Sequence, residues 1–391
     1  MESGLYIHIP FCSHHCGYCG FAVSARHVED QPFHDRYIAA ILRELQLQLR
    51  RFPDLQFSTL YMGGGTPSQL GIPEIEKLFR GIAAHIPFAA LREITFECNP
   101  EDIHRTPSLI DALHGLGVTR LSVGLQTLSE KGLQILERKS TRTMMEQAGD
   151  ILENKWRGRS LSYDLMIGWP GQTVREFQSM DLEFLRRCRF EHISLYILNY
   201  ERGTRLERNR KRSLVQPLDE DISANIWECW LDAATTLGLV HYEISNFSKE
   251  GHKSLHNRNT WRGLPYLGLG CGAVSRVGRV RWTNPATPEL YLKKIAQGRP
   301  PAVAAEYLTP TLSWQEDLFL SMRFEEGLDA TAFKHMHGVN PQHVLGDKLS
   351  VWREQGWLKA DALAFTSKGW TLFDALVSDW MLLIEKNSLG A

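Results

Sequence analysis

The chain has 391 residues, of which 43% are hydrophobic and 23% are charged, and its formal net charge is -1 at pH 7. This composition is typical of a soluble globular protein. The near-zero charge argues against nucleic acid as a partner, and it allows at most peripheral contact with an anionic membrane. No apolar run reaches the length of a bilayer span.

The first half of the chain alternates strand-like and helix-like segments. Apolar runs bounded by turn residues predict strands at residues 5–9, 58–62, 93–97, 120–123, 161–167 and 192–198. Apolar residues at helical spacing predict helices at 33–52, 72–82, 108–116, 130–137, 144–154 and 173–188. About six strand–helix units indicate a parallel sheet, too few for a closed eight-stranded barrel. We therefore expect an α/β fold built on a partial (β/α)6 barrel.

The rest of the chain changes character. A helix is predicted at 219–237 and a strand at 242–247, and the basic run 205–212 is expected to be a solvated loop. A Pro/Ala-rich connector follows near residue 300. Helices at 313–323, 329–337 and 345–354, a hairpin at 357–366 and a last helix at 369–383 resemble a winged helix. Because this segment is not especially basic, we expect it to serve as an interaction surface or a lid. The predicted domains are 1–215, 216–305 and 306–391.

Three cysteines, Cys12, Cys16 and Cys19, follow the first predicted strand at spacing C-x3-C-x2-C. A [4Fe–4S] cluster normally takes four thiolates, so three leave one iron open to another ligand. The alternative is a zinc site completed by His14 or His15. The chain has seven cysteines, an odd number, and its first residues lack the basic region of a signal peptide. Both features favour a reducing compartment, and we expect a cytoplasmic protein.

Polar residues and glycines stand at the ends of several later predicted strands. Residues 63–66 (Gly-Gly-Gly-Thr) end the second strand, and Glu97, Gln126 and Asp164 end the third, fourth and fifth. Arg138 lies just beyond and has the geometry to pair with a carboxylate. Each residue alone is compatible with a turn, a helix cap or a surface charge. Because parallel strands end at one rim, their combination favours a ligand site there.

These motifs resemble the radical S-adenosylmethionine (SAM) superfamily. Over nearly the whole length the chain is similar to the oxygen-independent coproporphyrinogen III oxidase family, and within it to the HemW-type heme chaperones. The segments that carry the resemblance are 6–21, 63–67, 97–100, 122–126, 164–173, 242–247 and 268–275, with the C-terminal helical region.

The resemblance implies a role for each matching residue. It implies that Cys12, Cys16 and Cys19 bind a [4Fe–4S] cluster whose open iron is chelated by SAM. The residues implied to contact SAM are Tyr6, Tyr18, Gly64, Gly65, Thr66, Glu97, Gln126, Arg138 and Asp164, with Ala273 and Val274 packing near the adenine.

Two features separate the chaperones from the true oxidases. The oxidases carry a fourth cysteine two residues after the third, where this chain has Phe21, and an extension ahead of the cluster motif, where only five residues precede Tyr6. The chaperones carry H-N-x-x-Y-W, which residues 256–261 match except at Thr260. His256 is thereby implied as an axial heme ligand; the alternative is a loop histidine bonded to the backbone. Ser140 stands where relatives carry histidine.

The function implied by this branch is a heme chaperone that delivers heme to apoproteins such as respiratory cytochromes. Its implied cofactors are the [4Fe–4S] cluster, SAM and heme, and its implied electron donor is a flavodoxin or ferredoxin. The alternative is an enzyme of porphyrin biosynthesis that decarboxylates coproporphyrinogen III by radical chemistry. A heme-degrading radical methyltransferase is a third possibility, which no residue favours.

Overall fold

The computed structural model describes residues 1–388, and a twelve-stranded sheet runs through them in the order β12-β11-β10-β9-β1-β2-β3-β4-β5-β6-β8-β7. Strands β1 to β6 are parallel to their sequence neighbours, as predicted. The first six are β1 (Glu2–Ile9), β2 (Gln56–Gly64), β3 (Glu93–Cys98), β4 (Arg120–Gln126), β5 (Ser160–Ile167) and β6 (His192–Ile197). The others are β7 (Val240–Glu243), β8 (Asn246–Ser248), β9 (Tyr266–Leu269), β10 (Val274–Val277), β11 (Val280–Thr283) and β12 (Ala304–Tyr307).

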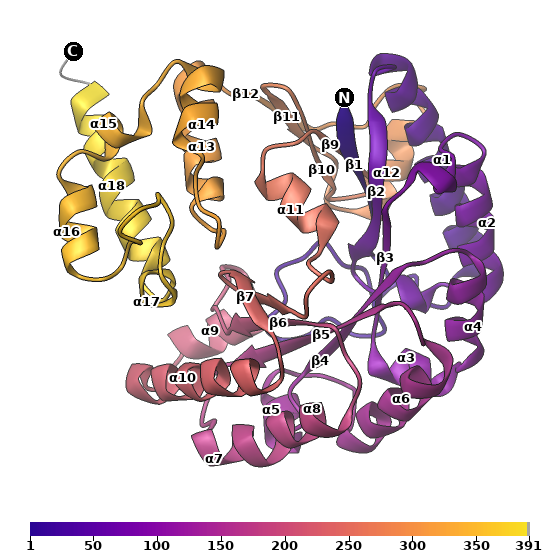
Figure 1. The fold of residues 1–391 in the computed structure, drawn as a ribbon. Helices are drawn as coiled ribbons and strands as arrows, with labels where there is room; N and C mark the ends of the chain where they lie inside the picture. Colours follow the sequence, from indigo (N-terminus) through magenta and orange to yellow (C-terminus); the bar gives the residue numbers. More distant parts are fainter. Residues whose placement is uncertain (389–391) are drawn as a thin grey trace.

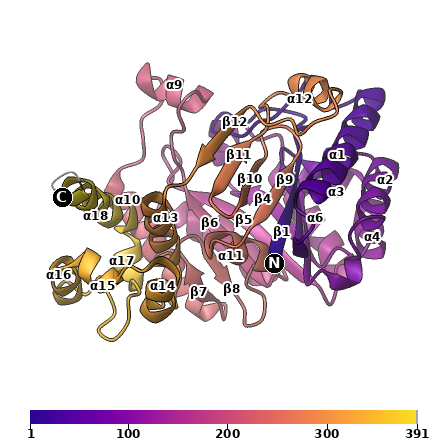
Figure 2. The same cartoon turned by 90° about the horizontal axis from the view of Figure 1, so that it is seen from above.

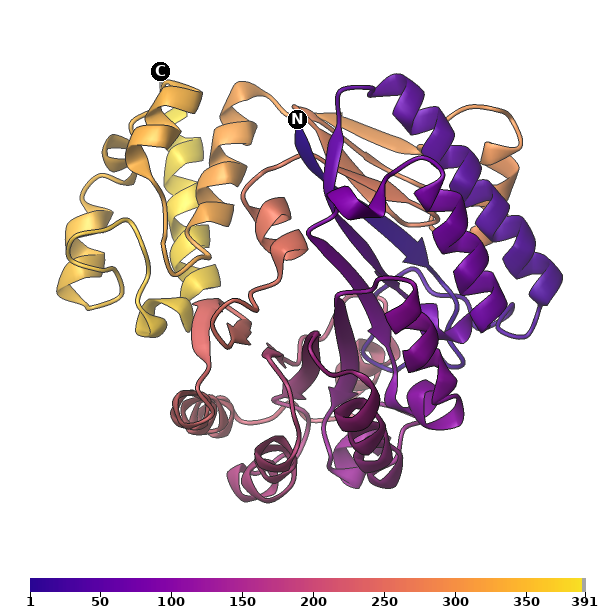
Figure 3. The same ribbon diagram turned by 45° about the vertical axis from the view of Figure 1, so that its right-hand side comes forward.

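The helices that connect the parallel strands form an arc along the outer face of the sheet (Figure 1). They are α1 (Gln31–Arg51), α2 (Ile72–Ala83), α3 (Pro100–Arg105), α4 (Ser108–Gly115), α5 (Glu130–Ile135), α6 (Arg142–Lys155), α7 (Val174–Glu176), α8 (Glu183–Arg187) and α10 (Glu220–Thr236). Helix α11 (Leu255–Trp261) lies on the inner side, against β1 and β2 (Figures 1 and 3). The partial barrel is confirmed, and its open side is where α11 and the C-terminal helices stand.

Side-chain alternation along the parallel strands decides what each face of the sheet carries. Successive residues of a strand point to opposite faces. The outer face of β3 to β6 is apolar and fully buried against the helices, with Ile94, Phe96, Leu121, Val123, Leu161, Tyr163, Leu165, Ile193 and Leu195. The alternate, inner residues are polar: Glu93, Thr95, Glu97, Arg120, Ser122, Ser160, Ser162, Asp164, His192 and Ser194. The inside of the barrel is therefore built to hold a polar ligand rather than a hydrophobic core.

Several segments differ from the prediction. The strand expected at 242–247 is a hairpin, because residues 244–245 form a turn whose Ser245 N–H donates to the Glu243 carboxylate (3.1 Å). The helix expected at 173–188 contains a π-helical segment, Phe177–Leu182. The connector after residue 300 includes β12, which pairs with β11. Strands β9 to β11 and helix α12 (Pro288–Ile295) were not predicted.

The basic run expected to be a loop is helix α9 (Arg205–Lys211). Thr204 caps it by accepting a hydrogen bond from the Glu207 N–H (3.2 Å), and Leu206 is buried. Helix α9 projects from the body of the molecule (Figure 2). Its first turn contacts the cysteine loop, because the Leu206 N–H donates to the Gly17 carbonyl (2.8 Å).

The C-terminal region is helical and has a second hydrophobic core, around Leu318, Trp352 and Trp380. Its helices are α13 (Pro310–Ser321), α14 (Ala330–His337), α15 (Pro341–Leu345), α16 (Lys348–Glu354), α17 (Ser367–Trp370) and α18 (Phe373–Ser388). An antiparallel bridge between Leu358 and Phe365 lies at the predicted hairpin. The sheet continues across residue 215, and the division into three domains stays a prediction. None of the helices in residues 1–388 combines the length and apolar character that crossing a bilayer requires.

Candidate functional site

A cavity of about 640 Å³ lies on the inner face of the sheet. It extends from the cysteine loop, at the carboxyl ends of the strands, to Arg120 and His192, near the amino ends of β4 and β6. The predicted site residues that line it are Cys12, Cys16, Cys19, Tyr18, Gly64, Gly65, Thr66, Glu97, Gln126, Arg138 and Asp164. The tertiary structure thus brings together eleven residues that the sequence spreads over about 150 positions.

The cysteine loop is held by backbone hydrogen bonds to the glycine segment. The Gly65 N–H donates to the Ile9 carbonyl (2.8 Å), and the Thr66 N–H donates to the Phe11 carbonyl (2.9 Å). A side chain at position 65 would collide with the backbone of Pro10. Glycine is therefore required where the two loops approach each other.

All three thiols of the loop are free. Thr66 Oγ1 lies 3.3 Å from Cys12 Sγ, and Arg138 Nη1 donates to Cys16 Sγ at 3.8 Å. Burial raises the pKa of Cys12 to about 12, so a metal must displace its proton to bind the thiolate. Among residues 1–388, no three His, Cys, Asp or Glu side chains are arranged to share one metal ion.

This arrangement fits a cluster better than a zinc ion. A [4Fe–4S] cube takes each thiolate on a different iron atom, whereas a zinc ion gathers its ligands around one centre. The histidines proposed for a zinc site have other partners: His15 Nε2 lies 2.9 Å from the Cys19 carbonyl, and His14 Nε2 accepts from Arg205 Nη2 at 3.4 Å. When bound, the cluster would supply an electron to SAM.

Arg138 connects three parts of the site. Its Nη2 donates to the side-chain oxygen of Asn99 (3.0 Å) and to the Gly124 carbonyl (2.8 Å), while the Asn99 amide donates to Thr66 Oγ1 (3.1 Å). Its Nε is buried and has no partner among the described residues. The guanidinium is thus fixed beside Cys16 with a donor to spare, as binding a carboxylate requires.

Two carboxylates stand further inside the cavity. Glu97 accepts hydrogen bonds from the Tyr61 hydroxyl (2.6 Å) and the Gly64 N–H (3.2 Å), and burial raises its pKa to about 7. Asp164 accepts from the Ser122 hydroxyl (2.9 Å), and burial raises its pKa as well. Both carboxylates can accept hydrogen bonds from ligand hydroxyl or ammonium groups.

Three predicted SAM contacts, Tyr6, Ala273 and Val274, do not line this cavity. The Tyr6 hydroxyl lies 3.1 Å from His8 Nδ1, and its ring centroid is 6.0 Å from that of Tyr61. Ala273 is buried in the loop between β9 and β10. Contact of these residues with SAM stays a prediction.

His256 lies in helix α11 rather than in the loop that its alternative reading assumed. Its Nδ1 is 2.9 Å from Thr59 Oγ1, and its ring centroid is 5.1 Å from that of Tyr61. Burial lowers the pKa of His256 to about 4, so the ring is neutral at pH 7. Among residues 1–388, Nε2 has no hydrogen-bond partner, and a neutral imidazole with one nitrogen held is suited to ligate a metal.

The two departures from the family pattern have local partners. Thr260 donates its hydroxyl to the His256 carbonyl (3.0 Å), within the same helix. The Ser140 hydroxyl donates to the Glu101 carboxylate, next to the Arg138 segment. Neither residue is hydrogen-bonded to the cysteines.

Sequence reasoning missed several residues of the cavity. Tyr61 and Asn99 hold Glu97 and Arg138, and Arg120 and His192 form the inner end. Side-chain alternation was the signal that could have found Tyr61, Arg120 and His192, because each of them lies on the inner face of its strand, among the polar residues. The exposed side chains Phe21 and Ile197 also line the cavity and give it apolar surface.

Comparison with known proteins agrees with this geometry. Residues 6–183 match the radical SAM superfamily. The heme chaperone HemW of Lactococcus lactis is 31% identical over 96% of this chain and 97% of that protein. The heme chaperone HemW of Bacillus subtilis is 31% identical over 90% and 91%. In fold, the chain matches the radical SAM enzyme coproporphyrinogen III oxidase (HemN) of Escherichia coli with a TM-score of 0.81, at 20% identity, over 97% of this chain and 89% of that one.

Proposed function

The chain belongs to the radical SAM superfamily, in the family of the HemW proteins, and on this premise we propose that it binds heme and transfers it to apoproteins such as respiratory cytochromes. The observation that carries the proposal is His256. Its Nδ1 is held by Thr59 at 2.9 Å, and burial, which lowers its pKa to about 4, keeps it neutral. Ligation of iron through the free Nε2 needs both features.

Heme titration is the direct test. Anaerobically reconstituted protein is titrated with heme, and the Soret band is followed to saturation. We expect one heme per chain and a loss of affinity of about tenfold or more in His256→Ala. The matched control is His335→Ala, because His335 is exposed on α14. Absence of stoichiometric binding would reject the proposal, and unchanged affinity in His256→Ala would remove this residue as the ligand.

The second candidate is oxidative decarboxylation of coproporphyrinogen III. It is supported by the fold match to the oxidase, and it is opposed by Phe21, which stands where the oxidases carry a fourth cysteine. Incubation of the reconstituted protein with SAM, a reductant and coproporphyrinogen III separates the two. Formation of protoporphyrinogen would replace the chaperone proposal with this one.

An external electron donor is part of the proposal, and helix α9 supports a docking place for it. Arg202, Arg208, Arg210 and Lys211 are exposed there, and Arg205 donates to the His15 carbonyl of the cysteine loop. A positive surface beside the cluster suits an acidic carrier such as a flavodoxin or ferredoxin. Reduction of the cluster by such a carrier should then slow as salt increases.

A further inference from the structure

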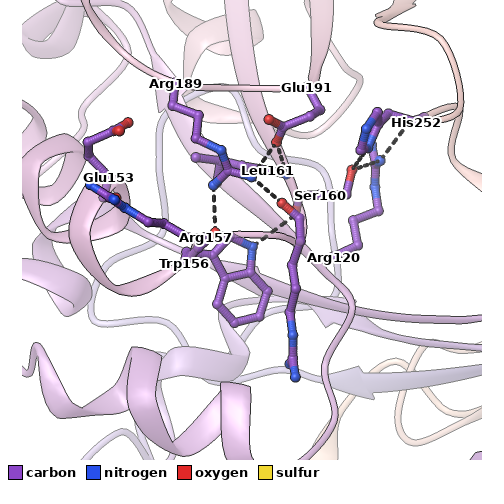
Figure 4. A network of polar contacts seen from close by, with 10 residues as sticks. Arg120, Glu153, Trp156, Arg157, Ser160, Leu161, Arg189, Glu191 and His252 are labelled. Carbon is purple, nitrogen blue, oxygen red and sulfur yellow. Dashed lines mark hydrogen bonds and ion pairs between the residues drawn. The ribbon is translucent and has the colours of Figure 1, made fainter.

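Arg120 is a buried positive charge at the inner end of the cavity. Its side chain is on the first residue of β4, is 4% exposed and lines the cavity. Its hydrogen bonds all use Nη1, which donates to the Ser160 hydroxyl (3.2 Å) and to the His252 carbonyl (3.1 Å) (Figure 4). Nη2 and Nε have no partner among residues 1–388.

No carboxylate of the described residues pairs with Arg120, although several lie on neighbouring strands. Glu191 pairs with Arg189 at 3.0 Å (Figure 4). Glu93 accepts the N–H groups of Leu255 and His256 at the start of α11 (both 2.9 Å). Each neighbouring carboxylate therefore has its own partner. Buried arginines are normally paired, because an isolated buried charge is costly.

Asp164 and the aromatic groups around Arg120 form no ion pair with it either. The charge of Arg120 acts on Asp164 and opposes the rise in its pKa, but the Asp164 carboxylate accepts from the Ser122 hydroxyl (2.9 Å), and burial keeps its pKa raised. His192 has both ring nitrogens engaged, with Ser162 and with the Tyr242 hydroxyl (2.8 Å each), and burial, then the charge of Arg120, lowers its pKa well below its usual range. His192 is thus neutral and does not compensate the guanidinium.

The same end of the cavity offers further polar groups. Asn257 and Ser254, from the start of α11, line it together with Ser194 of β6. Among residues 1–388, the Asn257 side-chain amide has no hydrogen-bond partner. A guanidinium with two free nitrogens and a nearby amide form a donor set that matches a carboxylate, since a carboxylate accepts several N–H groups at once.

We propose that the Arg120 end of the cavity binds a carboxylate group of the cavity's ligand. The inference rests on the proposed function, in which the ligand is heme, and the group is then one of its propionates.

The position of Arg120 distinguishes this site from the one implied for SAM. Strand β4 runs from Arg120 to Gln126, so the two ends are about 20 Å apart at roughly 3.3 Å per residue. Arg138 bonds Gly124 and Cys16, at the cluster end. The carboxylate of SAM belongs at Arg138, and the carboxylate of a second ligand belongs at Arg120. His256, beside Asn257 on α11, does not itself line the cavity. Its N–H is bonded to Glu93 and its ring to Thr59, toward the amino ends of β3 and β2, so it lies nearer to this end than to the cysteines.

The test compares heme with its dimethyl ester, which has the same ring and iron but no free carboxylates. Holoprotein is titrated anaerobically with each form in one detergent-containing buffer, and the Soret band gives both dissociation constants. We expect the wild type to bind the free acid about tenfold or more tightly than the ester, since a charge-assisted hydrogen bond has about that effect. Arg120→Gln should abolish the preference by weakening binding of the acid alone.

Two controls accompany the comparison. Arg157→Gln, an exposed arginine of the same region (Figure 4), should keep the full preference for the acid. Arg120→Lys retains the positive charge and should keep part of the preference for the acid. If Arg120→Gln does not fold, the Arg120→Lys variant provides the test. Equal affinities for acid and ester in the wild type, or a preference that survives in Arg120→Gln, would overturn the inference alone. Failure of the wild type to bind either form would instead overturn the proposed function, and with it the inference.

Discussion

Glu44 gives a quantitative prediction about stability and pH. This carboxylate of α1 is fully buried and accepts hydrogen bonds from the Gly270 N–H (3.0 Å), the Asn284 amide (2.8 Å) and the Tyr291 hydroxyl (2.7 Å). It therefore joins the first outer helix to the loop after β9 and to α12. Burial outweighs the three donors and raises its pKa from 4.5 to about 7.

The sign of the pH effect follows from this difference. Between pH 4.5 and about 7 the folded protein binds more protons at Glu44 than the unfolded chain does, so the free energy of unfolding falls as pH rises. At 1.36 kcal/mol per pKa unit, the total fall is on the order of 3 kcal/mol. Above about pH 7 this contribution is constant. Glu44→Gln cannot ionise and should lack this part of the pH dependence.

Urea unfolding under anaerobic conditions, at pH 5, 6, 7 and 8, measures the effect. The stability advantage of the wild type over Glu44→Gln should shrink by about 2.5 kcal/mol from pH 5 to pH 8, since part of the total change lies below pH 5. Glu97 and Asp181 are also buried carboxyls whose pKa values burial raises to about 7. Their titration, like any loss of bound cofactors, is common to both proteins and cancels in the difference. The control, Glu153→Gln at an exposed site, should follow the wild type at every pH. Parallel curves for the wild type and Glu44→Gln would refute the reasoning.

Two further substitutions address the cluster end of the cavity. Thr66→Val removes the hydroxyl that lies 3.3 Å from Cys12 Sγ. Because a hydrogen bond to a thiolate ligand favours the reduced cluster, the midpoint potential of the cluster should become more negative, which an anaerobic redox titration measures. An unchanged potential would contradict that hydrogen bond. Gly64→Ala places a methyl group against the His8 ring, at a residue whose φ is 108°. The free energy of unfolding should fall by about 1–3 kcal/mol or more, which thermal unfolding would detect. A variant as stable as the wild type would exclude this strain.

The local pattern of the sequence was sufficient for the parallel half of the fold. Apolar runs and helical periodicity predicted β1 to β6 and, except for α3, the helical segments between them, because each strand and the longer helices bury one apolar face. The later strands are three or four residues long, so their pattern carries little information. The turn that makes residues 242–247 a hairpin depends on Glu243, whose carboxylate accepts from Ser245 and is paired with Arg323 of the C-terminal region.

Local sequence was enough to predict which residues meet at the cysteine end of the cavity, since three cysteines within eight residues and polar residues at successive strand ends converge wherever parallel strands share a rim. The residues at the opposite end of the cavity could be identified only from the packed strands and helices. Alternation separates the two faces of a strand, but which face is enclosed depends on how the sheet curves. The contact of His256 with Thr59 joins residues 197 positions apart, and Arg120 becomes an unpaired charge only when every neighbouring carboxylate finds another partner. Such relations depend on distances between elements, which no local pattern contains.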